Sequence, residues 1–218
     1  MLTFDAWHFP DGETHLPRRM QKGALRVDGR LTYQYPLYQS GLKHCHRRRV
    51  AVDVGAHVGL FSYWMVRDFA QIVAFEPVEA HRECWAANVP ARAGDVLHAC
   101  ALGAGPGTVD METTPGSSGG TRVAGQGDIP LCTLDSLGLP MIDLLKIDVE
   151  GYELEVLQGA AATIVRCRPV VIVEQRAKQV ASFQHGPADA VAFLRHFGAT
   201  VAWTDKRDYV TVFPGGPA

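Results

Sequence analysis

The sequence predicts an α/β protein whose centre is a mostly parallel sheet, and two observations carry this prediction. Short apolar runs alternate with segments of helical periodicity, which is typical of β–α–β units. Each run is also apolar throughout instead of alternating with polar residues, as expected when helices cover both faces of a sheet. The expected strands are residues 50–54, 72–75, 96–102, 142–147 and 170–173. One expected helix follows the first strand and ends at residue 69, and the others span residues 78–88, 151–165 and 187–197.

The expected helix over residues 151–165 shows the helical pattern in most detail. Its apolar residues recur at helical spacing on one face, which is expected to pack on the sheet. Those residues are Leu154, Leu157, Ala161 and Ile164. Acidic residues crowd the start of the segment, where the helix dipole favours negative charge. The pattern therefore predicts a single long helix against the sheet.

The two ends of the chain depart from this alternation. Residues 199–204 and 208–213 are short apolar stretches separated by a charged turn, which predicts a final antiparallel hairpin. Residues 1–49 share no simple period and contain turn signals and aromatic side chains. We therefore divide the chain into an N-terminal extension, residues 1–49, and one domain over residues 50–218. The extension is expected to cover the ligand-binding edge of the sheet and to form part of a substrate pocket.

Composition and charge exclude several classes of protein. The 218 residues include 21 Lys and Arg against 23 Asp and Glu, and this net charge of −2 gives no overall attraction to nucleic acid or acidic membranes. No uncharged stretch is long enough for a bilayer-spanning helix, and the first residues lack the pattern of a secretory signal. The five cysteines are widely spaced, which favours a reducing compartment over a disulfide framework or a zinc site. We therefore expect a cytoplasmic protein.

A glycine-containing turn follows the first expected strand, within residues 50–62 (VAVDVGAHVGLFS). Gly55 and Gly59 would let backbone N–H groups at the start of the next helix approach a ligand closely. A dinucleotide fingerprint needs another glycine where this chain has His57, so NAD is disfavoured. With Asp53 before the first glycine, the pattern instead resembles that of S-adenosylmethionine (SAM) methyltransferases, in which the acid faces the amino-acid end of the cofactor. The alternative is a purely structural turn.

A second acid, Glu76, lies at the expected end of the second strand. An acid at this place can accept hydrogen bonds from the ribose hydroxyls of a nucleotide. The alternative is an ordinary acid before the helix that Pro77 opens. The register of Glu76 with the glycine turn favours the ligand-binding interpretation.

Two carboxylates end the fourth expected strand, in residues 144–152 (LLKIDVEGY). Ligands of open parallel sheets bind at the carboxyl ends of the strands. Asp148 and Glu150 are two residues apart in an extended segment, so they are expected to point to the same side. Glu174 ends the fifth strand and is expected at the same edge of the sheet. Alternatively, Glu150 caps the next helix and Asp148 faces solvent.

The motifs DVGAHVG, AFEP, HACALG, TLDSL and LLKIDVEGYELEVLQGA together resemble the FkbM family of SAM-dependent methyltransferases, over about residues 50–176. The resemblance implies a three-layer α/β/α Rossmann-like methyltransferase fold, with a mostly parallel seven-stranded sheet and a C-terminal antiparallel hairpin. It also implies SAM as the cofactor and methyl transfer to a hydroxyl of a small molecule or sugar. His57 stands where the family often has Asn. The cofactor-binding positions that it implies are Asp53, Gly55, Ala56, His57, Gly59, Glu76, Pro77, Ala101, Leu102 and Asp148.

Methyl transfer to an alcohol requires that the alcohol lose its proton, and a carboxylate within hydrogen-bond reach can accept it. Asp148 and Glu150 are the first candidates for this catalytic role, and Glu174 is the next. The same acids could instead bind Mg²⁺, a hard cation that takes oxygen ligands. Because the sequence alone assigns no third aligned carboxylate, we favour a site without metal and keep Mg²⁺ as the alternative.

Three further features leave alternatives open. Residues 113–128 are too rich in glycine and serine for a helix, and we expect a loop that is either a lid over the substrate or a solvent-exposed segment. His185 could reach the pocket as a base or simply be solvated. The basic cluster at residues 44–49 could contact phosphates, as in a nucleic-acid methyltransferase, although a solvated rim is favoured. A non-catalytic SAM-binding module is the last alternative, and the paired acids argue against it.

Overall fold

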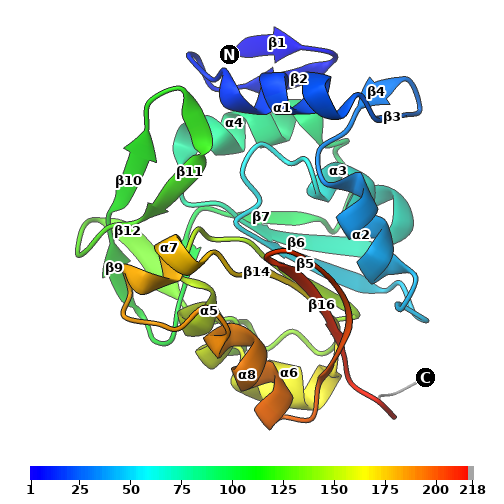
Figure 1. Cartoon of the computed structure of the whole chain (residues 1–218), viewed down its shortest axis with the longest axis vertical. Coiled ribbons are helices and arrows are strands. Elements are labelled where there is room, and N and C mark those ends of the chain that lie inside the picture. Colours follow the sequence, from blue (N-terminus) through cyan, green and yellow to red (C-terminus); the bar gives the residue numbers. More distant parts are fainter. Residues whose placement is uncertain (216–218) are drawn as a thin grey trace.

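A seven-stranded sheet forms the centre of the computed structural model, which describes residues 1–215 (Figure 1). Five strands run parallel, and the other two form an antiparallel hairpin at one edge. This arrangement confirms the expected fold class. Residues 216–218 of the expected domain lie outside the described residues. In spatial order the strands are β15 (Thr200–Asp205), β16 (Asp208–Val212), β14 (Val170–Glu174), β13 (Leu144–Ile147), β5 (Val50–Val54), β6 (Gln71–Phe75) and β7 (Val96–His98).

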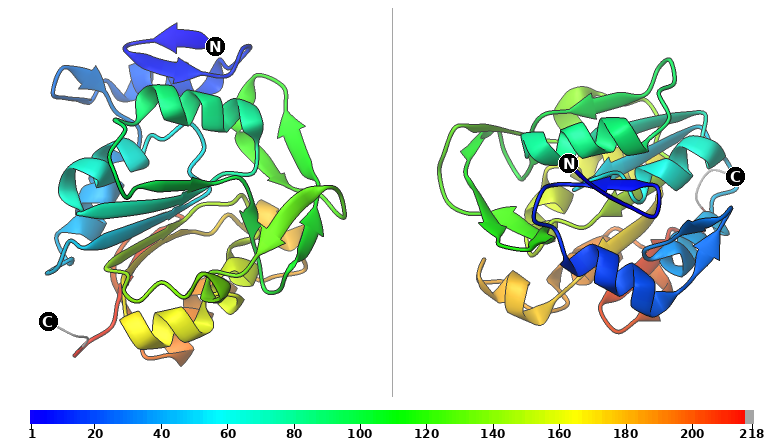
Figure 2. Two further views of the ribbon diagram at one scale, coloured as in Figure 1. Left: turned by 180° about the vertical axis from the view of Figure 1, so that it is seen from behind. Right: turned by 90° about the horizontal axis from the view of Figure 1, so that it is seen from above.

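Helices pack on both faces of this sheet, which explains why its strands are apolar throughout (Figure 2). Val52 and Val54 belong to a buried cluster with the helices of one face. Ala51, which alternates with them, belongs to a second cluster with the helices of the other face. The result is the three-layer α/β/α architecture. The first face carries α5 (Glu153–Gln158), α6 (Ala161–Cys167) and α8 (Asp189–His196), and the second carries α2 (Tyr35–Leu42) and α3 (Ser62–Asp68).

The expected helix over residues 151–165 is wrong in one respect, because two helices, α5 and α6, occupy this segment. Asp135 interrupts the helix from outside. Its backbone N–H donates to the carbonyl of Gly159, and its carboxylate accepts the N–H groups of Ala162 and Thr163. A side chain from another segment therefore caps α6 as a separate helix.

The expected strand over residues 96–102 is also divided. Its first part, β7, joins the central sheet, whereas the second part pairs with a separate small sheet. Residues 113–128, expected to be a loop, contain most of a β-hairpin. Glycine and serine exclude a helix there but do not exclude a half-buried strand. The small sheet consists of β8 (Ala101–Leu102), β12 (Ile129–Cys132) and β9 (Gly107–Val109), and the hairpin of β10 (Met111–Thr114) and β11 (Ser117–Val123).

The N-terminal extension forms secondary structure of its own and packs on the glycine turn. Trp7 and Met20 share a buried cluster with Val58, just after the first glycine of the turn. Asn88 attaches the extension to α4, because its amide nitrogen donates to the carbonyl of His8 at 2.8 Å and its oxygen accepts the N–H of His8 at 2.7 Å. The elements are β1 (Leu2–Phe4), β2 (Trp7–Phe9), α1 (His15–Gly23), β3 (Arg26–Val27), β4 (Arg30–Leu31) and α2, with α4 at Glu79–Asn88.

Two short elements complete the structure, a 3₁₀ helix at Asp135–Leu137 and α7 at Ala177–Ala181. Among residues 1–215, no helix combines the length and the hydropathy that crossing a bilayer requires.

Gly55 offers a direct test of how tightly the glycine turn packs. Its φ is 72°, and a Cβ at this position would clash with the carbonyl oxygen of Asp148 after the neighbouring strand. We expect Gly55→Ala to lower the free energy of unfolding by about 3 kcal/mol or more, measured by chemical denaturation. Gly94→Ala is the matched control, because Gly94 has a φ of 92° but open space at its Cβ position. The control should lose only about 1 kcal/mol of backbone strain. Equal losses would show that the contact with Asp148 does not constrain the turn.

Candidate functional site

A cavity lies at the carboxyl ends of β5, β6 and β13, the edge at which open parallel sheets bind ligands. The glycine turn and the segment after β13 line one side of it. The N-terminal extension and the β10–β11 hairpin line the facing side, and Figure 1 shows both segments above this edge of the sheet. From the extension, the wall includes His15, Leu16, Arg19, Tyr33 and Gln34.

Glu76 holds the glycine turn in shape. One carboxylate oxygen accepts the backbone N–H of His57 at 2.8 Å, and the other accepts the N–H of Val78 at 2.9 Å. His81 adds a third contact through Nδ1 at 3.2 Å. A carboxylate has about four acceptor positions, so Glu76 keeps capacity for a further donor from the cavity that it lines.

Two adjacent histidines, His57 and His81, pack at this end of the cavity with ring centroids 4.4 Å apart. Burial, with His81 and Lys146 nearby, holds the pKa of His57 well below its usual value. His57 is therefore neutral at physiological pH, and its ring can exchange a hydrogen bond without adding charge to the cavity.

Asp53 does not face the cavity, contrary to the expectation that it would meet the amino-acid end of a ligand. Its side chain is fully buried, and Lys146 Nζ lies 3.0 Å from Oδ1 while the Ser62 hydroxyl donates to Oδ2 at 2.6 Å. Lys146 also donates to the carbonyl of Gly55 at 2.7 Å. Burial alone would lower the pKa of Lys146, but the carboxylates of Asp53 and Asp148 outweigh it and raise the pKa. Asp53 thus acts on the turn through a buried ammonium group.

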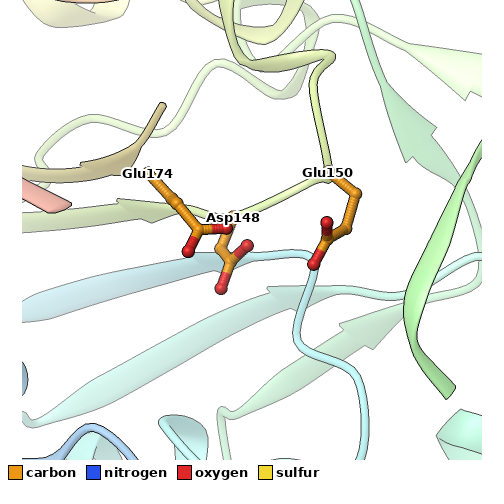
Figure 3. A group of neighbouring side chains, drawn as sticks. All are labelled: Asp148, Glu150 and Glu174. Atoms are coloured by element: carbon orange, nitrogen blue, oxygen red, sulfur yellow. The ribbon is translucent and has the colours of Figure 1, made fainter. Parts of the chain in front are cut away.

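The three predicted catalytic acids come together as one acidic cluster, Asp148, Glu150 and Glu174. Carboxylate oxygens from all three lie within 4.8 Å of one another, and Figure 3 shows the carboxylates gathered around Asp148. Asp148 and Glu150 line the cavity, whereas Glu174 is 3% exposed and does not. Among residues 1–215, the Asp148 carboxylate makes no hydrogen bond or ion pair, so it is the member of the cluster available to a ligand.

Two arginines bind the buried members of the acidic cluster. Arg176 Nε lies 2.8 Å from Glu174, and its terminal nitrogen lies 3.3 Å from Glu150. Arg207 Nε contacts the second oxygen of Glu174 at 2.7 Å. Gln179 also donates to Glu150. Glu174 is therefore enclosed by two guanidinium groups and not directed at the cavity, which corrects its predicted role as a direct proton acceptor.

A fourth carboxylate adjoins the cluster, because Asp208 on β16 is the register partner of Glu174 on β14. Four carboxylates thus face two guanidinium groups in a buried region. Burial, reinforced by Asp148, raises the pKa of Glu150 to about 8 and that of Glu174 to about 9. The same causes raise the pKa of Asp208 to about 6. The cluster therefore retains protons near neutral pH.

The β10–β11 hairpin is attached to the extension and to the glycine turn through Ser118. Its backbone N–H and hydroxyl both lie 2.5 Å from one carboxylate oxygen of Glu13. The hydroxyl also lies 2.9 Å from Nε2 of His57. The other oxygen of Glu13 accepts the N–H groups that begin α1. Three segments far apart in the sequence thus meet at the Ser118 hydroxyl, which contacts both Glu13 and His57.

All but one of the remaining predicted cofactor-binding residues line the cavity, and the exception is Gly59. The lining residues are Gly55, Ala56, His57, Glu76, Pro77, Ala101 and Leu102. Gly59 is absent from the wall and serves the packing of the turn, since a Cβ there would meet the side chain of Val89 at 2.5 Å. His185 also lies outside the cavity wall and contacts Glu155 at 2.5 Å.

The basic cluster at residues 44–49 lies at the opposite, amino end of β5. Its last residue, Arg49, forms an ion pair with Asp143 at 2.5 Å. His44 and Arg47 line a separate hollow that does not adjoin the cavity. The cluster therefore contributes no charge to the candidate site.

Sequence reasoning missed Arg176, Arg207 and Asp208. The sequence could have indicated Arg176, because it follows Glu174 by two residues at the same strand end. Arg207 and Asp208 come from the final hairpin, and their place beside Glu174 depends on the pairing of β14 with β16.

Comparison with known proteins identifies relatives of the segment that carries these motifs. The model of the methyltransferase FkbM domain matches residues 53–201. Methyltransferase sdnD of Sordaria araneosa is 30% identical in a match that covers 50% of this chain and 59% of that protein. Hexuronic acid methyltransferase AglP of Haloferax volcanii is 27% identical, with coverage of 60% and 58%. The matches therefore span less than two thirds of these relatives.

A solved structure shares the fold at low sequence identity. The TehB-like SAM-dependent methyltransferase of Corynebacterium glutamicum superimposes with a TM-score of 0.51 and 9% identity, covering 90% of this chain and 92% of that one. The likeness extends over nearly the whole of both chains and supports the Rossmann-like assignment of the sheet and helices.

The raised pKa values of the acidic cluster predict how stability depends on pH. A carboxyl whose pKa is higher in the folded state keeps its proton there while the unfolded chain releases it, so stability falls as pH rises. We expect the contribution of these carboxyls to the free energy of unfolding to fall between about pH 5 and pH 9, the window from the ordinary glutamate value of 4.5 to the pKa of about 9 for Glu174. Glu174→Gln should reduce this slope, measured by urea denaturation across the window. Glu83→Gln, at an exposed acid on α4, is the control and should retain it. An unchanged slope in Glu174→Gln would contradict a retained proton.

Proposed function

The chain belongs to the FkbM methyltransferase family, and from this premise we propose that it transfers a methyl group from SAM to a hydroxyl oxygen of a small molecule or sugar. The observation that carries the proposal is an unpartnered carboxylate, Asp148, at the cavity end of a buried acidic cluster. A hexuronic acid methyltransferase among the relatives supports a sugar as the acceptor.

The donor set of the cavity fits SAM. Phe75, Ala101 and Leu102 offer an apolar surface for the adenine, and Glu76 retains acceptor capacity for a ribose hydroxyl. The turn at Gly55 would hold the amino-acid end. When bound, SAM supplies a methyl group already activated on a sulfonium sulfur. The chain's own residues then need only to position the acceptor, exclude water and accept a proton.

Asp148 is the residue we assign to accept the proton of the acceptor hydroxyl. Its carboxylate lines the cavity, whereas Glu150 is bound by Arg176 and Gln179. With a pKa of about 8, Glu150 carries a proton at neutral pH and can donate a hydrogen bond to the acceptor or to Asp148. Glu174 supports the pair by holding Arg176 in place.

The arginines argue for a reaction without metal. A divalent cation bound by all three acids would have to approach Glu150 and Glu174, and Arg176 already contacts both. Arg207 occupies the other oxygen of Glu174. Guanidinium groups therefore take the place that Mg²⁺ would need, and Asp148 alone is a weak site for it.

A nucleic-acid acceptor is less well supported. The basic cluster at residues 44–49 lies at the opposite end of β5 from the cavity, and Arg49 is paired with Asp143. A phosphate backbone held there would not bring a base to Asp148. A non-catalytic binding module remains the alternative, and turnover distinguishes it from an enzyme.

SAM binding is the first expected result. Adding SAM should raise the melting temperature, because a ligand that binds only the folded state stabilises it by mass action. Glu76→Gln should weaken SAM binding about tenfold in isothermal titration calorimetry, since it removes a charged hydrogen-bond acceptor. Glu79→Gln, an exposed acid at the start of α4, is the control and should bind SAM as the natural chain does. Tight binding of NAD without binding of SAM would contradict the assignment.

Turnover with a panel of sugars and small alcohols, each paired with its amino analogue, tests the reaction. We expect conversion of SAM to S-adenosylhomocysteine, with the new methyl group on oxygen by NMR. Asp148→Asn should lower kcat by about 10²-fold or more through loss of the proton acceptor, whereas Asp128→Asn, outside the cavity wall, should not. EDTA should leave turnover unchanged. Activity lost with EDTA and restored by Mg²⁺ would overturn the metal-free site, and methylated nitrogen would overturn the choice of acceptor.

A further inference from the structure

One cationic side chain of the cavity has no partner. Lys146 is paired with Asp53, and Arg176 is paired with Glu150 and Glu174. Arg19 also lines the cavity, but among residues 1–215 it forms no ion pair and its guanidinium donates no hydrogen bond. Its N–H donors therefore remain available to a ligand.

The structure fixes where Arg19 stands. It belongs to α1, whose first N–H groups donate to Glu13 and whose Leu16 and Met20 are buried. The guanidinium carbon lies over the ring of Tyr33, 5.6 Å from its centroid. The packed helix and the aromatic ring thus position this exposed cation at the edge of the cavity that it lines.

Tyr33 adds a second potential donor to this part of the cavity wall. The Tyr33 side chain lines the cavity, and its hydroxyl makes no hydrogen bond to another residue in the described part of the chain. Burial, together with the charge of Asp148, raises the pKa of Tyr33 to about 12, so its hydroxyl keeps its proton and remains a donor. Arg19 and Tyr33 therefore present a guanidinium group and a phenol hydroxyl to the same cavity that Asp148 lines.

We propose that Arg19 and Tyr33 form a carboxylate-binding subsite of this cavity. A guanidinium group pairs with a carboxylate through two parallel hydrogen bonds, which neither a lysine nor a neutral donor reproduces. The subsite lines the same cavity as Asp148, and its guanidinium group gives a ligand carboxylate a cationic partner there. The inference rests on the proposed function, because it assigns this subsite to the same ligands.

Two carboxylates can reach the subsite: the α-carboxylate of SAM and the carboxylate of an acidic acceptor such as a uronic acid. Both carboxylates would pair with the guanidinium group in the same way. Arg19 lies outside residues 53–201, so the family match gives no role to Arg19. The two sources can be distinguished by comparing the binding of SAM with the binding of an analogue that lacks the amino-acid part.

The first measurement compares SAM with 5′-methylthioadenosine, which lacks the amino acid and hence the carboxylate, by isothermal titration calorimetry. If the subsite holds the cofactor, Arg19→Met should weaken SAM about tenfold and leave 5′-methylthioadenosine unchanged. Arg19→Lys should restore only part of the affinity, because a single ammonium group cannot form the paired contact. Arg18→Met is the matched control, since Arg18 is the neighbouring, equally exposed arginine on α1 but does not line the cavity.

The second measurement compares turnover of D-glucuronate and other hydroxy acids with turnover of their uncharged amides. If the subsite holds the acceptor, the natural chain prefers the acids about tenfold or more in kcat/KM, and Arg19→Met removes the preference without changing SAM affinity. Tyr33→Phe should reduce the same preference by a smaller factor.

Two results would overturn the subsite. One is an Arg19→Met variant that binds SAM as tightly as the natural chain and has the same preference for acids over amides. This result would overturn the subsite even if no acceptor in the panel is converted. The other is an equal loss of SAM and 5′-methylthioadenosine binding, which would show that Arg19 only supports the fold. Failure of the proposed function differs from both, because the natural chain itself would then not bind SAM.

Discussion

A buried ion pair between neighbouring strands determines the shape of the cavity floor. Asp53 of β5 and Lys146 of β13 are register partners, and their charged atoms lie 3.0 Å apart. Both side chains are almost fully buried, so losing either partner would leave an uncompensated charge in the interior. Lys146 also donates to the carbonyl of Gly55, which extends the pair into the glycine turn. The glycine turn then presents the backbone N–H of His57 to the carboxylate of Glu76. The strands, the turn and the acid beside it are therefore one electrostatic unit.

The acidic cluster around Glu174 balances its charge partly with protons and not only with ion pairs. Around Glu174, carboxylates outnumber guanidinium groups, and the difference is met by retained protons. Arg176 and Arg207 prevent this excess from becoming a metal site, and they leave Asp148 as the member that can act on a ligand.

Features that depend on a few consecutive residues were predictable from the sequence. The parallel sheet, the glycine turn and the gathering of Asp148, Glu150 and Glu174 at one edge follow from the apolar runs and from where each run ends. What Asp53 faces was not predictable, because its orientation depends on Lys146 in a strand far away in the sequence. Arg207 was equally hidden, since only the pairing of the last hairpin brings it to Glu174. The extension has no periodicity of its own, and its structure depends on the surface that it covers.

The two walls of the cavity have different origins in the chain. Residues 53–201, the segment that defines the family, hold the glycine turn and the acids. His15, Arg19 and Tyr33 of the facing wall all precede that segment. The family match therefore covers the glycine turn, the acids and the β10–β11 hairpin, but not the part of the facing wall that the extension forms. Two proteins with the same motifs are thus free to differ in what they bind by exchanging the extension alone.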